Sequence, residues 1–324
     1  MIDITPFKKE HLQDAAKLVS KRYIDLQKQI PLLPAKYKKE SAFIPLLHNI
    51  LDADNPGVAA LQNGSLVGFL TGWRLPSFRG ERSIYSPEWG NGADLSGSKQ
   101  IYEEMYSKLA KIWVEEKFSA HYISLFPNDS DALKSWHWMG FGMISVDAIR
   151  GLDPILDSKP DIKVRKAEVD DLQQVMDLHQ ELRIYMKESP IFLPRNEQSQ
   201  SYFRDWLQDP NKVVWLGLKD NEPAAFMRLG PADEDVCTII LDKGTTSIYA
   251  AYTKESYRFE GAGAAVLEQS LFSARSSGYK RCAVTFEPMN LIGTRFWLKY
   301  FTPVCYSLLR HIDVRLFLPD GDEI

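Results

Sequence analysis

The pattern of hydrophobic and polar positions occurs twice along the chain. Residues 2–18 alternate like a half-buried strand and then take helical spacing, and residues 162–178 repeat this 160 positions later. In the helical parts, apolar residues recur at intervals of three and four, which is typical of an amphipathic helix. Because further matches follow in the same order, the pattern predicts an internal duplication. The identical residues are Leu12, Gln13 and Leu18 in the first copy and Leu172, Gln173 and Leu178 in the second.

Each copy continues with a predicted hairpin. Residues 58–73 turn at Asn63-Gly64, a pair that accepts positive φ, and residues 213–229 turn at 220–222. A strand, a long helix, a strand and a final helix and strand follow in both copies. This order predicts the α/β class, with two tandem domains that each contain a mixed, mostly antiparallel sheet flanked by helices.

The length of 324 residues suits two domains of ordinary size. Gly151, Pro154 and Pro160 indicate a linker over residues 151–160. We therefore expect one domain over residues 1–150 and a second over residues 161–324.

Composition excludes several kinds of partner. The net charge is −4 with both signs interspersed, so nucleic acid is not expected. No segment approaches the roughly 20 apolar residues of a membrane span, and the N-terminus lacks the apolar core of a signal peptide. Cys237, Cys282 and Cys305 form no disulfide or metal pattern, and we expect buried thiols in a cytoplasmic protein. The scattered histidines show no zinc spacing, so no metal is expected.

A glycine-containing turn precedes the long helix of the second copy. The predicted strand 246–253 leads into Arg258-Phe-Glu-Gly261-Ala-Gly263-Ala264, and a helix then runs to Gly278. The first amides of a helix lack partners within it, and glycines let a phosphate approach the backbone closely. The turn could therefore bind a diphosphate, with Arg258 adding positive charge. By itself, this pattern is also compatible with a simple tight turn.

The segment from Arg258 to Ala264 resembles the phosphate-binding turn of the GNAT acetyltransferases. It follows the fourth strand and precedes the third helix, as in that family, and residues 290–301 resemble a downstream family segment. Two such domains in one chain is an architecture similar to that of mycothiol synthase. The resemblance implies acetyl-CoA as co-substrate, with the turn on its pyrophosphate and Ala251 to Thr253 beside its pantetheine. The coenzyme-binding residues it implies are Ala251, Tyr252, Thr253, Arg258, Phe259, Glu260, Gly261, Ala262, Gly263, Ala264, Asn290 and Trp297.

The first copy lacks this turn. At an offset of 161, Gln100 and Tyr102 fall opposite Gly261 and Gly263, and a tyrosine there would obstruct a phosphate. We therefore expect a degenerate, non-catalytic first domain.

The resemblance implies direct attack of an amine on the thioester of acetyl-CoA. A base must accept the ammonium proton, and Glu287 is preferred over Glu255 and Glu260, although each could be an ordinary surface acid. The family often supplies an acid where this chain has Trp297, which would pack on the coenzyme or the core. Tyr300 is the substitute we favour; the alternatives are Tyr252, Tyr257 and Tyr306.

The sequence predicts an N-acetyltransferase for a small-molecule amine or a peptide amino-terminus. The alternative is a non-catalytic protein of this fold that binds acyl-CoA or a metabolite. Arg195, Glu197 and Arg228 could contact a polar acceptor or could be surface charge. The oligomeric state stays open between monomer and homodimer.

Overall fold

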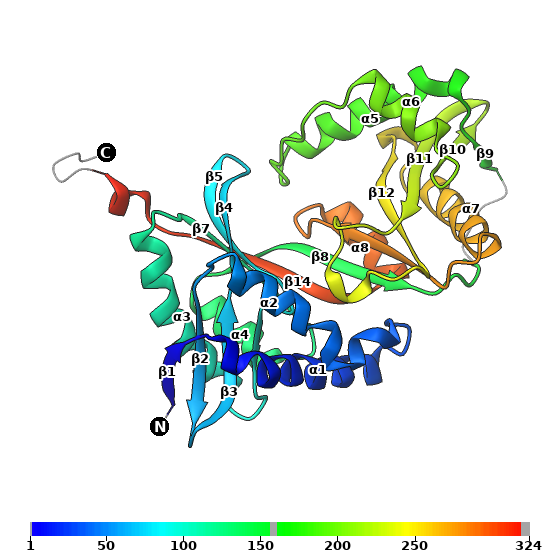
Figure 1. Ribbon diagram of the computed structural model, residues 1–324. Coiled ribbons are helices and arrows are strands. Elements are labelled where there is room, and N and C mark those ends of the chain that lie inside the picture. The colour runs from blue at the N-terminus through cyan, green and yellow to red at the C-terminus, as the bar shows by residue number, and fades with distance from the viewer. Residues whose placement is uncertain (1, 156–160, 319–324) are drawn as a thin grey trace. The chain divides into compact units, whose positions relative to one another are not determined.

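The computed structural model describes residues 2–155 and 161–318 and divides them into two units (Figure 1). The first unit contains residues 2–146, 237–239 and 303–318, and the second contains residues 147–155, 161–236 and 240–302. Half of the predicted linker, residues 156–160, lies outside the described residues.

The first unit builds two sets of strands. One has the order β1-β2-β3-β6 and is antiparallel, and the other has the order β4-β5-β7-β14, in which only β5 and β7 are parallel. The predicted hairpin turn is confirmed, because Asn63 and Gly64 join β2 to β3 with φ of 52° and 79°. The strands are β1 (Asp3–Pro6), β2 (Gly57–Gln62), β3 (Ser65–Thr71), β4 (Trp73–Phe78), β5 (Glu81–Ser86), β6 (Asn91–Ala93), β7 (Ala120–Leu125) and β14 (Thr302–His311).

Helices pack their apolar faces on these strands. Helix α3 buries Met105, Leu109 and Trp113 with Trp136 of α4 in one aromatic-rich core. The helices of this unit are α1 (Leu12–Gln29), α2 (Ile44–Asp52), α3 (Ser98–Glu115) and α4 (Ser130–Trp138).

In the second unit, strands pair in the order β13-β12-β11-β10-β9. All neighbours are antiparallel except β12 and β13, so the expected mixed, mostly antiparallel sheet is confirmed. Asp220 and Asn221, both with positive φ, form the predicted turn between β10 and β11. The strands are β9 (Lys163–Lys166), β10 (Val213–Lys219), β11 (Glu222–Pro231), β12 (Thr245–Thr253) and β13 (Arg281–Phe286).

Helices cover both faces of this sheet (Figure 1). Helices α5 and α6 bury Leu172, Val175 and Trp206 against one face, where Phe226 of β11 completes the core. Helix α7 covers the other face, where an added Cβ on Gly217 of β10 would lie only 2.7 Å from Val266. The helices are α5 (Leu172–Lys187), α6 (Gln200–Gln208), α7 (Ala262–Ser276) and α8 (Leu291–Tyr300).

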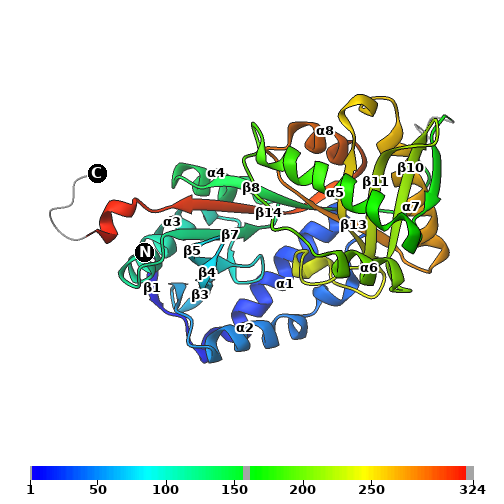
Figure 2. The same cartoon turned by 90° about the horizontal axis from the view of Figure 1, so that it is seen from above.

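The units do not follow the predicted boundaries. The last strand, β14, pairs antiparallel with β7 of the first unit, from Tyr306 opposite Leu125 to His311 opposite Ala120 (Figure 2). Strand β8 (Gly142–Arg150) begins in the first unit and ends in the second. The physical reason is that a strand edge accepts any strand with the right register, wherever that strand lies in the sequence. Neither 1–150 nor 161–324 is therefore a complete unit.

Candidate active site

Strand β12 separates from its neighbour halfway along its length. It pairs in parallel with β13 from Thr245 to Ile248, whereas its antiparallel pairing with β11 continues to Thr253. The bulge at Arg228/Leu229 of β11 lies at the same level. The end of β12 therefore presents backbone groups that a bound extended molecule could pair with, and Ala251, Tyr252 and Thr253 all line a cavity there.

The glycine turn forms the N-terminus of α7. Gly261 is the N-cap with φ of 92°, and the amide of Ala265 donates to its carbonyl at 3.0 Å. The amides of Ala262, Gly263 and Ala264 thus precede the first helical hydrogen bond and carry the positive end of the helix dipole. Phe259 also has positive φ, but its side chain is 87% exposed and so does not close the turn.

Gly263 faces the interior of the cavity. A Cβ at this position would lie 3.2 Å from Thr253 Oγ1 and 3.4 Å from the ring of Phe296. Any larger side chain would therefore occupy the space between the end of β12 and α8.

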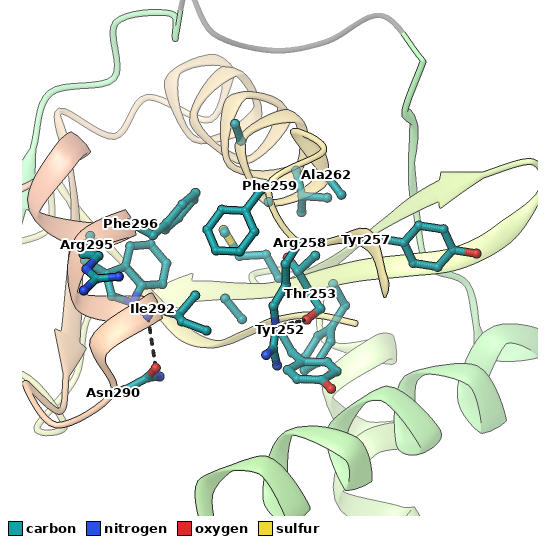
Figure 3. Close-up of a pocket in the computed structure, with 18 of the residues that line it drawn as sticks. Tyr252, Thr253, Tyr257, Arg258, Phe259, Ala262, Asn290, Ile292, Arg295 and Phe296 are labelled. Carbon is teal, nitrogen blue, oxygen red and sulfur yellow. Dashed lines mark hydrogen bonds between the residues drawn. The ribbon is translucent and has the colours of Figure 1, made fainter. Parts of the chain in front are cut away.

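Arg258 lies at the same opening (Figure 3). Its Nε donates to the carbonyl of Thr253 at 3.3 Å, and its guanidinium carbon lies 4.5 Å from the ring centroid of Tyr185. These contacts hold the guanidinium between the end of β12 and α5, next to the ring of Tyr252.

The cavity has a volume of about 600 Å³. Its lining contains the cations Arg258, Arg295 and Lys299 and includes no Asp, Glu or His among the described residues. Such a lining favours an anionic ligand. The predicted site residues that line it are Ala251, Tyr252, Thr253, Arg258, Phe259, Gly261, Ala262, Gly263, Ala264, Asn290, Trp297 and Tyr300.

Asn290 holds the start of α8 and contacts α5. Its Oδ1 accepts a hydrogen bond from the amide of Gly293 at 3.0 Å (Figure 3). The same Oδ1 accepts a second hydrogen bond from the Tyr185 hydroxyl at 2.8 Å. Burial raises the pKa of Tyr185, although the positive charge of Arg258 opposes this shift. Sequence reasoning missed Tyr185, because a contact across 105 positions leaves no local signal.

The three predicted acids do not line the cavity. Oε1 of Glu287 accepts a hydrogen bond from Arg195 at 2.6 Å, and Glu260 forms an ion pair with Lys219. Glu255 lies in the short 3-10 helix Glu255–Tyr257, between β12 and the turn. The structure therefore brings the glycine turn, Asn290 and Tyr300 together, but leaves these carboxylates outside the lining.

Trp297 and Tyr300 enter the cavity from α8. Trp297 is buried and packs against Phe296 and Phe301. Tyr300 packs edge-on against Phe296, with the two ring centroids 5.1 Å apart. Of the alternative tyrosines, Tyr252 and Tyr257 also line the cavity, whereas Tyr306 lies on β14 in the first unit.

The start of α3 in the first unit corresponds to the start of α7, but the residues that correspond differ from those that the sequence alignment predicts. Helix α3 also has a glycine N-cap with positive φ, Gly97, so Lys99 rather than Tyr102 takes the place of Gly263. By the same count, Asp94 stands where the second unit has Arg258. The alignment predicted from the sequence uses the offset of 161 between neighbouring strands, whereas the helix N-caps Gly97 and Gly261 do not follow that offset.

Side chains of the first unit interact at the start of α3. Buried Arg22 donates to Asp129 at 3.1 Å and to the Tyr102 hydroxyl at 2.6 Å. Asp129, the N-cap of α4 as Asn290 is of α8, also accepts a hydrogen bond from Ser98 at the start of α3. An internal carboxylate thus caps α4 and also lies against the first residue of α3.

Comparison with known proteins agrees with this geometry. Residues 175–301 match the model of the acetyltransferase (GNAT) family. A GCN5-related N-acetyltransferase from Sphaerobacter thermophilus aligns over 96% of this chain and 95% of its own, with a TM-score of 0.58 and 10% identity. No curated protein matches the sequence.

A second solved structure has a similar fold over most of this chain. It is a GCN5-related glucosamine N-acetyltransferase region of a fungal multi-domain GH3 beta-N-acetylglucosaminidase, with a TM-score of 0.52 and 12% identity. The alignment covers 95% of this chain and 38% of that one. At these identities, both structures show a shared fold.

Among the described helices, none is both long and apolar enough to cross a bilayer.

Proposed function

We propose, from the family match over residues 175–301, that the chain is a member of the GNAT superfamily and that its second unit is an N-acetyltransferase. Acetyl-CoA would be the donor, and a small-molecule amine or a peptide amino-terminus the acceptor. One observation carries the proposal: the open edge of β12 leads directly to a glycine-opened helix N-terminus beside a cavity lined by cations.

The residues of the second unit divide the binding task among them. The amides of Ala262 to Ala264 would hold the diphosphate, and Arg258 would add charge to the same group. The backbone of Ala251 to Thr253 would pair with the pantetheine amides. A backbone amide near the point where β12 and β13 separate would polarise the thioester carbonyl.

Proton transfer needs both an acceptor and a donor. A primary amine is almost fully protonated at neutral pH, so its proton must leave before attack. Glu287, engaged by Arg195, and Glu255 are the side-chain candidates for this step; a bound water is the alternative because neither lines the cavity. Tyr300 is the proposed donor to the departing thiolate.

A non-catalytic acyl-CoA-binding protein is the second candidate function. It is favoured by one observation, the lack of an acidic or histidine side chain among the described lining residues. In that case the coenzyme would bind, but no amine would be acetylated.

Two measurements separate these possibilities. Titration calorimetry should detect binding of coenzyme A and acetyl-CoA to the wild type, and binding should be lost in Gly263→Val, because its side chain fills the cavity. Gly142→Val is a matched control, since an added Cβ there meets no atom within 4 Å. Absence of binding in the wild type would refute both candidates.

Thiol release across a panel of amines then distinguishes transferase from binding protein. We expect release above the hydrolysis background with at least one class of amine. Coenzyme binding without such release would support the non-catalytic function.

A separate proposal concerns the first unit. We expect it to bind no coenzyme A, because the Arg22–Asp129 ion pair lies near the start of α3, which corresponds to the start of α7.

A further inference from the structure

A buried guanidinium group lies on the α5 and α6 side of the sheet. Arg228 of β11 is 4% exposed, and its Nη2 donates to the Tyr202 hydroxyl at 3.1 Å. Its Nε and Nη1 have no hydrogen-bond partner among the described residues. These two atoms carry three of the five N–H donors of an arginine. Burial of so many unsatisfied donors on a charged group is strongly unfavourable unless something else binds them.

Aromatic rings surround this guanidinium. Its central carbon lies 4.3 Å from the ring centroid of Trp206, 5.3 Å from that of Tyr202 and 5.6 Å from that of Phe203. Cation–π contacts stabilise the charge in part and hold the guanidinium plane in place. However, these contacts do not supply a hydrogen-bond acceptor to Nε or Nη1.

Further positive charge gathers next to Arg228. His179 of α5 packs edge-on against Phe203, and burial together with the charges of Arg228, Arg183 and Arg195 lowers its pKa to about 4. The two outer arginines have acidic partners, because Arg195 pairs with Glu287 and Arg183 lies 3.8 Å from Glu197. No ion pair joins Arg228 to an acidic side chain in the described part of the chain. One positive charge is therefore left without an anion.

The position of Arg228 links it to the cavity. Phe226 lines the cavity and lies two residues before Arg228, so both side chains leave β11 on the same face, about 7 Å apart. On α5, His179 precedes the cavity residue Leu182 by three positions and so lies on the same helix face. Arg228 pairs with Ala250 of β12. Ala250 lies two residues after Ile248, the last residue of β12 that pairs with β13. The backbone of Arg228 therefore lies at the level where β12 and β13 separate, next to the proposed position of the thioester.

From this geometry we propose that the acceptor is an amino acid or another amino carboxylate, and that Arg228 binds its carboxylate. The inference rests on the proposed transferase function, since the same ligand would present its amine to the thioester. A guanidinium matches a planar carboxylate through two parallel N–H···O bonds. A single carboxylate also balances the one uncompensated charge, whereas a phosphate dianion would require another free cation.

The first experiment compares matched acceptors. Acetyl transfer is measured for a set of amino acids, each beside its carboxamide and its decarboxylated amine, in the wild type, Arg228→Gln and Arg204→Gln. Arg204 lies on the exposed side of α6 and is the control. We expect the wild type and the control to prefer the carboxylates by about 100-fold in kcat/KM, a preference that Arg228→Gln loses mainly through KM. Equal kcat/KM values for all three acceptor types in the wild type would overturn the carboxylate proposal and leave the transferase function standing.

The second experiment separates binding from transfer. The unfolding midpoint of the same proteins is measured with the amino acids or their carboxamides, with and without coenzyme A. Amino acids should raise the midpoint of the wild type and Arg204→Gln but not that of Arg228→Gln. This result without coenzyme A binding would refute the proposed transferase while supporting the carboxylate site. Equal effects of acids and carboxamides would refute the carboxylate site.

A stability measurement tests whether Arg228 has a purely structural role. Arg228→Met removes an unsatisfied buried charge and keeps an unbranched side chain among the rings, so we expect a higher unfolding midpoint in the absence of ligand. The midpoint of Arg204→Met should stay close to that of the wild type. A lower midpoint for Arg228→Met, together with an unchanged KM for the best acceptor, would overturn the proposal.

Discussion

At the scale of single residues, Tyr300 is the side chain with the clearest proposed chemical role. It lines the cavity from α8 and could protonate the departing thiolate. We predict that Tyr300→Phe lowers kcat by roughly 100-fold, because it removes a proton donor, and leaves the Kd of coenzyme A unchanged. Steady-state kinetics and calorimetry measure the two quantities.

Tyr306→Phe is the control for this substitution. Tyr306 lies on β14 in the first unit and is not a cavity residue, so its kcat should equal that of the wild type. A wild-type kcat in Tyr300→Phe would exclude this hydroxyl as the donor and favour water.

His121 makes a second prediction at this scale. Burial lowers its pKa to about 4, and the positive charge of Arg310 acts in the same direction. In the unfolded chain the imidazole titrates near 6.5, so between pH 6.5 and 4 the unfolded state binds more protons. This contribution to stability is therefore full above pH 6.5 and decreases as the pH falls to 4, by up to about 3 kcal/mol.

Denaturant unfolding of the first unit at pH 7 and pH 4.5 measures this effect. We expect His121→Gln to lose less stability than the wild type between the two pH values, because the variant lacks the titrating group. Equal losses would show that His121 is not responsible for the acid sensitivity.

At the scale of elements, α8 depends on a side chain that also belongs to the cavity. Asn290 caps the helix, and an added Cβ on Gly293 would lie 2.7 Å from its Nδ2. We predict that Asn290→Ala lowers the free energy of unfolding by about 1 kcal/mol and weakens coenzyme A binding, because the helix start and the contact with Tyr185 are both lost.

Ser199→Ala provides a matched loss of a cap. Ser199 caps α6 by accepting a hydrogen bond from the amide of Tyr202 at 3.2 Å, and it is not a cavity residue. A similar loss of stability with unchanged coenzyme binding is expected. If Asn290→Ala bound coenzyme as tightly as Ser199→Ala does, Asn290 would be a structural residue alone.

At the scale of the whole molecule, the C-terminal strand β14 belongs to the first unit, so the stability of that unit should depend on it. Because β14 pairs with β7, removal of residues 303–324 deletes a strand of the first unit. We predict faster hydrogen exchange in β7 after this truncation, while β10 and β11 of the second unit keep their protection. Greater loss of protection in β10 and β11 than in β7 would contradict the assignment of β14.

Most local features of this protein were predictable from its sequence. Asn63-Gly64 and the turn at 220–222 form hairpins because few residues accept positive φ, and the glycine turn before α7 follows from the same steric rule. The helical repeat and the strand alternation likewise predicted a mixed sheet flanked by helices, because side-chain periodicity reflects which face is buried.

Other features could not be predicted because they join distant positions. The Arg195–Glu287 pair, the Tyr185–Asn290 hydrogen bond and the Arg22–Asp129 pair each connect side chains about 90 residues apart or more. Nothing in the neighbouring sequence indicates which charge will meet which. The sequence therefore favours Glu287 as a base but carries no sign of its arginine partner.

The sequence by itself determined the repeated order of elements and the position of the glycine turn, since both depend on the steric preferences and burial of residues close together in the chain. Only the tertiary structure decided that β14 completes the first unit, that Arg22 pairs with Asp129 near the start of α3, and that Arg228 is buried with no acidic partner in the described part of the chain. The reason is that backbone edges and charges are satisfied by whichever groups folding brings near them, regardless of sequence distance.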